Sequence, residues 1–109
     1  MAHSVNDILR AKRLLPVIVL QREADAVPVA NALESGGLPI AEVTFRTEAA
    51  AASIAAIRKS VPGVRVGAGT ITSIAQIGQA IDAGAEFLVT PGFNPRVVEQ
   101  ALKLSLIHI

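Results

Sequence analysis

Short apolar runs alternate with longer stretches of helical periodicity along this chain. Four of the runs are rich in β-branched or aliphatic residues, are too short for helices and are bounded by glycine or proline, which is typical of buried strands. The four predicted strands are Val17 to Leu20, Ile40 to Phe45, Val64 to Val66 and Phe87 to Thr90. Because alanine-rich helical stretches separate them at similar intervals, the pattern predicts four successive β/α units and a parallel sheet.

The first two helical stretches differ in regularity. Ser4 and Asp7 are spaced as a capping box, in which the hydroxyl and the carboxylate each accept from a backbone N–H, so a short helix is expected before the first strand. Between Glu23 and Ser35 the apolar positions share one face, but Pro28 lacks the backbone donor that an interior position needs. We expect a kink or a late helix start there.

The three later helical stretches each follow a residue whose side chain can accept from the first backbone N–H groups. Asn94 precedes a proline, which suits the first position of a helix. The expected caps and helices are Thr47 with Glu48 to Ser60, Ser73 with Ile74 to Ala83, and Asn94 with a last helix that begins at Pro95 and buries Val97, Val98, Ala101 and Leu102.

The length of the chain limits the architecture. With 109 residues, of which 51% are hydrophobic and 17% charged, the chain has the composition of one globular domain. Right-handed crossovers make successive parallel strands neighbours, so four units form either an open doubly wound sheet or part of a closed barrel. A complete barrel needs about 250 residues. A half-barrel would leave its first and last strands as open edges and its inner face in water.

Charge and cysteine content exclude several kinds of site. A formal net charge of +1 without a basic run argues against nucleic acid and membrane surfaces as partners, and the absence of cysteine excludes disulfides and thiolate metal sites. The polar N-terminus lacks a signal core and no run approaches the ~20 apolar residues of a membrane span, so a cytoplasmic location is expected. His3 and His108 lie near the termini, away from the predicted strand ends, and receive no metal-binding or catalytic role.

The second predicted strand carries polar side chains toward its carboxyl end, where barrel active sites lie. Alternation places Glu42, Thr44 and Arg46 on one side, while Val43 and Phe45 face the helices. Glu42 can then act as a general acid/base and Arg46 as a clamp on a planar carboxylate. The alternative is an internal ion pair along one side of the strand. The cost of placing a charge inside a barrel favours the functional interpretation.

Two further strand ends carry conformationally special residues. The segment Gly67 to Thr70 fails the dinucleotide fingerprint, because Thr72 stands where the third glycine should be. Its glycines either let a ligand approach the backbone or form a tight strand-to-helix turn with positive φ, and both interpretations stay open. The segment Thr90 to Gly92 ends the fourth strand. In a barrel these ends converge on the same face as Glu42 and Arg46.

Taken in order, these motifs resemble those of the KDPG/KHG aldolase family, the 2-keto-3-deoxy-6-phosphogluconate and 4-hydroxy-2-oxoglutarate aldolases. The resemblance runs from about Ile8 to about Leu104, roughly half of a family member. The matching segments are Pro16 to Leu20, Ala26 to Pro28, Gly36 with Gly37, Glu42 to Thr47, Val66 to Thr70 and Thr90 to Gly92. The resemblance implies the first four β/α units of a (β/α)8 TIM barrel behind a short leading helix.

The resemblance also implies a chemistry. Family members are class I aldolases, typically homotrimers, in which a lysine forms a Schiff base with a 2-keto acid and C–C cleavage releases pyruvate and an aldehyde. They act in sugar-acid catabolism, including the Entner–Doudoroff pathway, and need no metal or organic cofactor. By resemblance Glu42 shuttles protons, Arg46 holds the carboxylate of a small-molecule 2-keto acid substrate, Thr70 contacts the substrate, and Pro91 forms a wall of the pocket.

One departure concerns the nucleophile, because the family lysine lies on the sixth strand. Lys12, Lys59 and Lys103 all fall on predicted helices, and the phosphate site that barrels commonly build after strands seven and eight has no counterpart among these motifs. We expect the chain alone to be inactive. The alternatives are a non-catalytic half-barrel that self-associates through its open edges, and a phosphate-binding barrel of another family, which would not need the pair Glu42 and Arg46.

The last six residues have two interpretations. Residues 104–109 read as the translation of a transposase-type sequencing adaptor, which makes residues 1–103 the N-terminal half of an aldolase barrel and 104–109 an artefactual tail. The alternative is a natural apolar segment that begins the next strand, and its alternation suits a strand.

Overall fold

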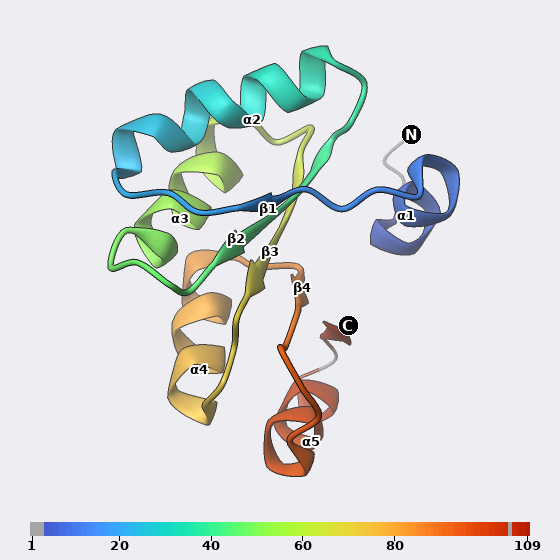
Figure 1. Ribbon diagram of the computed structural model, residues 1–109, viewed down its shortest axis with the longest axis vertical. Coiled ribbons are helices and arrows are strands. Elements are labelled where there is room, and N and C mark those ends of the chain that lie inside the picture. Colours follow the sequence, from blue (N-terminus) through green and yellow to red (C-terminus); the bar gives the residue numbers. More distant parts are fainter. Residues whose placement is uncertain (1–3, 105) are drawn as a thin grey trace.

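The computed structural model describes residues 4–104 and 106–109, in which helices alternate with the strands of one parallel sheet (Figure 1). The predicted α/β class with a parallel sheet is confirmed. The helices are α1 (Val5–Lys12), α2 (Ala26–Ser35), α3 (Ala50–Ser60), α4 (Ile74–Ala83) and α5 (Pro95–Lys103), with a short 3-10 helix η1 (Glu23–Asp25) before α2. The strands are β1 (Val17–Ile18), β2 (Ile40–Thr44), β3 (Arg65–Gly69), β4 (Phe87–Leu88) and β5 (Ile107–His108).

The order of the strands in the sheet follows the chain, from β1 at one edge to β5 at the other. The centre is the pair β2 and β3, whose register runs from Ile40 beside Arg65 to Thr44 beside Gly69. A fifth strand joins the four that the apolar runs predict, because Ile109 N donates to Leu88 O at 2.8 Å. The strand expected from the second interpretation of the last residues is therefore present, whereas an artefactual origin of 104–109 stays a prediction.

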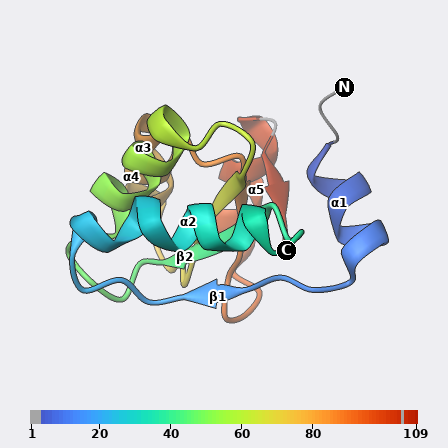
Figure 2. The same cartoon turned by 90° about the horizontal axis from the view of Figure 1, so that it is seen from above.

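Helices α2, α3 and α4 lie together on one side of the sheet (Figure 2). The core between these layers is aliphatic, and small alanine side chains on the helices bring the helix backbones close to the strands. Ile54 and Ile57 of α3 pack in this core against Val43 and Val66 of the central strands, and all four are almost fully buried. Burying each such side chain contributes roughly 1.5–3 kcal/mol, so this layer carries much of the stability.

The opposite face of the sheet has its own smaller core near the amino ends of the strands. Val5 and Ile8 of α1 pack there against Ile40 of β2 and Phe87 of β4. The leading helix therefore covers one end of the inner face, as its position beside the sheet in Figure 1 shows. Farther along β1, Val17 and Val19 remain 58% and 46% exposed, so the rest of that face is open.

Most of the predicted helix boundaries are confirmed. Ser4 forms the expected capping box with Asp7, and the side chains of Ser73 and Asn94 accept from the first turns of α4 and α5. The late start also holds, because α2 begins at Ala26 after η1 and places Pro28 in the first turn. A backbone donor there would have no partner within the helix, so proline costs little.

Two details of the predicted helices are wrong. Thr47 does not cap α3, which begins at Ala50 without a side-chain cap; the Thr47 hydroxyl instead donates to the backbone carbonyl of Leu20. Leu102 does not face inward but is 66% exposed, since α5 buries Val97 and Ala101 with no further layer on its other side.

Candidate functional site

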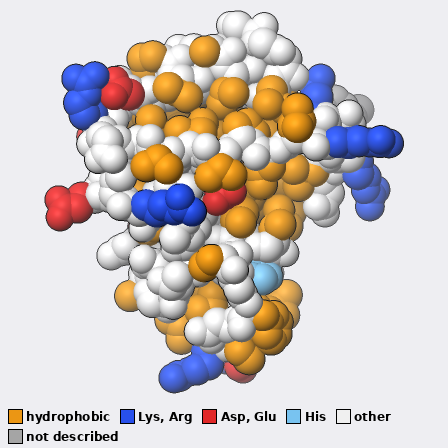
Figure 3. Space-filling view, viewed as in Figure 1, with side chains coloured by type: hydrophobic (Ala, Val, Ile, Leu, Met, Phe, Trp, Pro, Cys, Tyr) orange, Lys and Arg blue, Asp and Glu red, His pale blue; other side chains and the backbone are white. Residues whose placement is uncertain are grey.

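Polar side chains collect on the inner side of β2, toward the carboxyl ends of the strands. Val43 packs with the helix-side core, so Glu42 and Thr44 lie on the opposite side of β2, as alternation predicts. Arg46 lies in the turn after the strand, and its positive charge acts on Glu42. In Figure 3 an acidic and a basic side chain lie next to each other among hydrophobic side chains near the middle of the visible face. The two ionisable groups therefore have mostly apolar side chains as neighbours on this face.

Glu42 is a buried carboxyl, with 5% of its surface exposed. Burial raises its pKa above the ordinary value, because a charged carboxylate loses hydration there, and the positive charge of Arg46 partly opposes the rise. A carboxyl in this setting can both accept and release a proton nearer to neutral pH than an exposed glutamate.

The glycines of β3 make room for side chains, and the interpretation of this segment as a tight turn with positive φ at its glycines is wrong. Neither Gly67 nor Gly69 has positive φ; both lie within the strand. A Cβ at Gly67 would overlap the ring of Phe87, and a Cβ at Gly69 would overlap the carboxyl group of Glu42. The positive φ of this segment, 56°, belongs to Thr70 instead.

Arg46 and Thr70 are joined across the ends of β2 and β3. The Nε of Arg46 donates to Oγ1 of Thr70 at 3.2 Å, while the ion pairs among residues 4–104 and 106–109 do not include Glu42 with Arg46. The internal ion pair that the sequence left open is therefore absent from this part of the chain. With its Nε held, Arg46 can present its two terminal nitrogens to a planar carboxylate.

Pro91 lies apart from these three residues. It lines an open cavity of about 220 Å³ together with Ile71, Thr72 and the residues that lead into α5. Glu42, Arg46 and Thr70 are not among the residues that line it. The structure thus brings three of the four predicted site residues together and leaves the fourth on the neighbouring loop.

His108 has a contact that the sequence did not suggest. It lies in β5 rather than away from the strand ends, and its Nε2 is 2.9 Å from Oγ1 of Thr90. Oγ1 of Thr90 also lies 2.8 Å from Gly92 O, so the imidazole is the donor to Thr90 in the tautomer that carries its proton on Nε2. The partner residues are far apart in sequence, so no local pattern could have signalled this contact. His3 lies outside the described residues.

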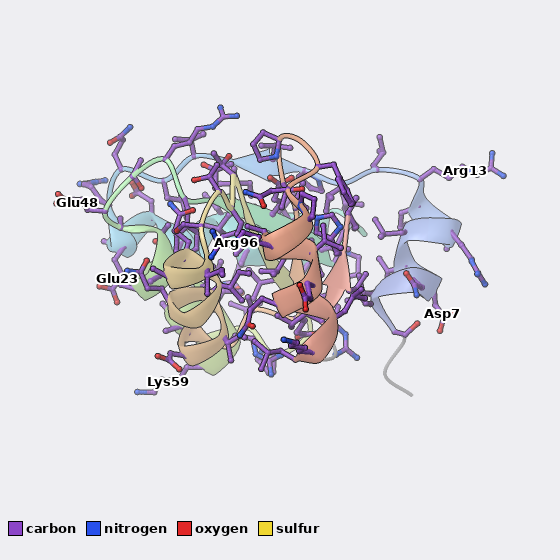
Figure 4. All side chains as sticks on the ribbon, turned by 90° about the horizontal axis from the view of Figure 1, so that it is seen from below. Asp7, Arg13, Glu23, Glu48, Lys59 and Arg96 are labelled. Atoms are coloured by element: carbon purple, nitrogen blue, oxygen red, sulfur yellow. The ribbon has the colours of Figure 1, made fainter. Side chains whose placement is uncertain are left out.

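The lysines occupy the positions that the sequence predicts. Lys12, Lys59 and Lys103 are exposed and lie on α1, α3 and α5, and Lys59 points away from the molecule in Figure 4. No group of three or more His, Cys, Asp or Glu side chains in the described part of the chain is arranged to hold a metal ion. Nor does a helix there have the length and apolar character required to cross a membrane.

Comparison with known protein families shows which family this chain belongs to. A family model described as "KDPG and KHG aldolase" matches residues 5–109. The chain belongs to this family. Among curated members, 2-dehydro-3-deoxy-phosphogluconate aldolase of Treponema pallidum is 50% identical over 99 residues, covering 91% of this chain and 47% of the relative. KHG/KDPG aldolase of Escherichia coli is 42% identical over 98 residues, covering 90% of this chain and 46% of the relative.

Solved structures of the aldolase family have the same fold. The 2-keto-3-deoxy-6-phosphogluconate aldolase of Zymomonas mobilis superposes with a TM-score of 0.89 at 38% identity, covering 98% of this chain and 52% of that one. KDPG aldolase of Legionella pneumophila, solved with pyruvate captured as a covalent carbinolamine intermediate, gives a TM-score of 0.82 at 34% identity, covering 87% and 46%. The chain spans about half the length of the relatives that it matches.

Proposed function

We propose that this chain is the N-terminal half of a class I aldolase, the first four β/α units of a (β/α)8 barrel. The full enzyme would cleave 2-keto-3-deoxy-6-phosphogluconate to pyruvate and glyceraldehyde 3-phosphate, or 4-hydroxy-2-oxoglutarate to pyruvate and glyoxylate. The observation that carries the proposal is the contact of Arg46 with Thr70 beside the buried carboxyl of Glu42. Together they supply a carboxylate clamp and a proton carrier at adjacent strand ends.

The proposed roles follow from the surroundings of each residue. Arg46 binds the carboxylate next to the ketone, and Thr70 limits the orientations of the guanidinium. Glu42 transfers protons during Schiff-base formation and again when the enamine of pyruvate is protonated, tasks for which a raised pKa suits a carboxyl. Pro91 would join the pocket wall from the next loop.

The nucleophile must come from outside these residues. A Schiff base requires a lysine amine within reach of the ketone, and the exposed lysines of α1, α3 and α5 are not at the carboxyl ends of the strands. The covalent carbinolamine with pyruvate in the Legionella pneumophila enzyme supports lysine chemistry for the family. We therefore expect the chain to be inactive by itself and active when a second half-barrel supplies the lysine.

The test is to join this chain to the C-terminal half of the Treponema pallidum aldolase and to measure pyruvate release with a lactate dehydrogenase coupled assay. The joined protein should release pyruvate, and borohydride with pyruvate should add mass to a lysine of the appended half. Glu42→Gln should abolish most turnover, whereas Glu48→Gln, an exposed control, should not. Pyruvate release by the 109-residue chain alone, with trapping at Lys12, Lys59 or Lys103, would contradict the proposal.

A second function, self-association without catalysis, is favoured by one observation. Leu14, Val17 and Val19 leave an apolar strip of 46–63% exposed side chains along the β1 edge of the sheet. Two copies could cover these strips and pair their open edges. Sedimentation equilibrium of the 109-residue chain discriminates: a defined dimer with a single cooperative melt supports this function, and a stable monomer excludes it.

A further inference from the structure

Thr44 has a buried hydroxyl that the proposed chemistry does not yet use. Its side chain is fully buried, and its Oγ1 has no hydrogen-bond partner among residues 4–104 and 106–109. Leaving such a hydroxyl unpaired destabilises the folded state, a cost that a valine of similar shape would avoid. A threonine at this central position of the sheet therefore needs a reason beyond packing.

The carboxyl of Glu42 reaches the level of this hydroxyl along the sheet, although the two groups are not hydrogen-bonded in the structure. Glu42 has Gly67 as its register neighbour on β3, yet its carboxyl occupies the space where a Cβ of Gly69 would stand. Gly69 is the register neighbour of Thr44, and paired positions on adjacent strands are about 4.8 Å apart with side chains on the same face. The carboxyl has thus leaned along the strand to the level of Thr44.

We infer that Thr44 is a positioning residue for Glu42, whose ionised carboxylate accepts a hydrogen bond from the Thr44 hydroxyl. A carboxylate is acceptor-only and a threonine hydroxyl has one proton to donate, so a small rotation that brings the two groups into contact would pair the buried hydroxyl. The inference rests on the proposed function for its purpose: the bond would aim the carboxyl that exchanges protons with the substrate.

No other charged group competes for this role from the neighbouring strands. Val17 of β1 and Gly67 of β3 flank Glu42 in register and carry no charge, so the charged group acting on Glu42 is Arg46 of the loop after β2. Arg46 in turn donates to Thr70. On β2 itself, Thr44 is the uncharged donor on the same side as Glu42.

The experiment is a 13C NMR titration of the glutamate carboxyl groups in the 109-residue chain. Loss of a donor to the charged form should raise the pKa of Glu42, by about one unit or more in Thr44→Val. Thr44→Ser keeps the donor and should leave the pKa near that of the parent chain. Ser53→Ala is the matched control, because Ser53 also has a buried, unpaired hydroxyl but lies on α3.

An unchanged pKa in Thr44→Val, with the amide spectrum of the folded chain retained, would overturn the inference, as would equal shifts in Thr44→Val and Ser53→Ala. If Thr44→Val does not fold, Thr44→Ala removes the same donor with less bulk and carries the same expectation. The two proposals fail in different ways. A shifted Glu42 pKa in Thr44→Val together with no pyruvate release by the joined enzyme contradicts the aldolase proposal alone. Pyruvate release by the joined enzyme without a shift of the Glu42 pKa in Thr44→Val contradicts this inference alone.

Discussion

Arg46 of the loop after β2 donates from Nε to the hydroxyl of Thr70, which follows β3, at 3.2 Å. Thr70 accepts this bond from a left-handed backbone conformation, with φ of 56°, that threonine rarely adopts. Such a conformation costs of order 1–3 kcal/mol and persists where surrounding contacts hold it. The strain therefore coincides with the residue that orients the guanidinium.

The first prediction concerns this pair in the joined enzyme. Arg46→Lys should lower kcat/KM roughly 10- to 100-fold, because lysine cannot offer paired donors to a carboxylate. Thr70→Val should cost less, roughly 5- to 10-fold, since the guanidinium keeps its charge and loses one orienting bond. Arg10→Lys, on the exposed side of α1, is the control. Unchanged kinetics in Arg46→Lys would remove the carboxylate clamp from the mechanism.

The second prediction concerns Gly69 of β3, which lies against the side chain of Glu42. A methyl group at Gly69 overlaps the flexible end of Glu42, which can swing away. Gly69→Ala should therefore keep the fold while the pKa of Glu42 falls toward its ordinary value, since the displaced carboxyl regains water. The 13C titration of the carboxyl groups measures this. A Glu42 pKa that stays raised in Gly69→Ala would mean that Gly69 does not shape the site.

The third prediction is that Gly67→Ala destabilises the fold, unlike Gly69→Ala. Its methyl group overlaps the fully buried ring of Phe87, so the ring or the strand must shift to admit it. Overpacking of this kind costs about 1–3 kcal/mol of unfolding free energy. Gly78→Ala is the matched control on α4, where a Cβ has open space and should stabilise the helix by about 0.5–1 kcal/mol. Urea unfolding of both variants tests the contrast, and equal free energies of unfolding would contradict it.

These glycines show where sequence reasoning stops. The β/α alternation, the caps at Ser4 and Ser73 and the common side of Glu42 and Arg46 follow from local patterns, because periodicity and capping depend on residues within a few positions. Close glycines in a strand look like a turn when read alone. Gly67 makes room for Phe87 of β4 and Gly69 makes room for Glu42 of β2, so the reason for each glycine lies on a neighbouring strand.

Competition between local and distant partners explains the other errors. The Thr47 hydroxyl can cap a helix or bond a distant carbonyl, and in the structure it donates to Leu20 O, 27 residues away in the sequence. In the same way, the contact of His108 with Thr90 exists because β5 pairs with β4. Both contacts require the folded sheet, so the sequence pattern alone could not distinguish them.

The last prediction concerns pH and follows from the raised pKa of Glu42, caused by burial. A carboxyl with a higher pKa in the folded than in the unfolded state holds its proton more tightly when folded. Its stabilising contribution is therefore full below the unfolded pKa and is lost as pH rises through the folded pKa. Over that window the free energy of unfolding should fall by up to about 1.4 kcal/mol per pH unit relative to a variant that cannot titrate.

Glu42→Gln is that variant, because glutamine keeps the shape and has no proton to lose. As pH rises above the ordinary pKa of glutamate, the free energy of unfolding of the parent chain should fall relative to that of Glu42→Gln, measured by urea unfolding at each pH. Glu48→Gln, at an exposed position, should follow the parent curve. Parallel curves for the parent and Glu42→Gln would show that burial does not hold the proton on Glu42, and the proton-carrier role would then lack its physical basis.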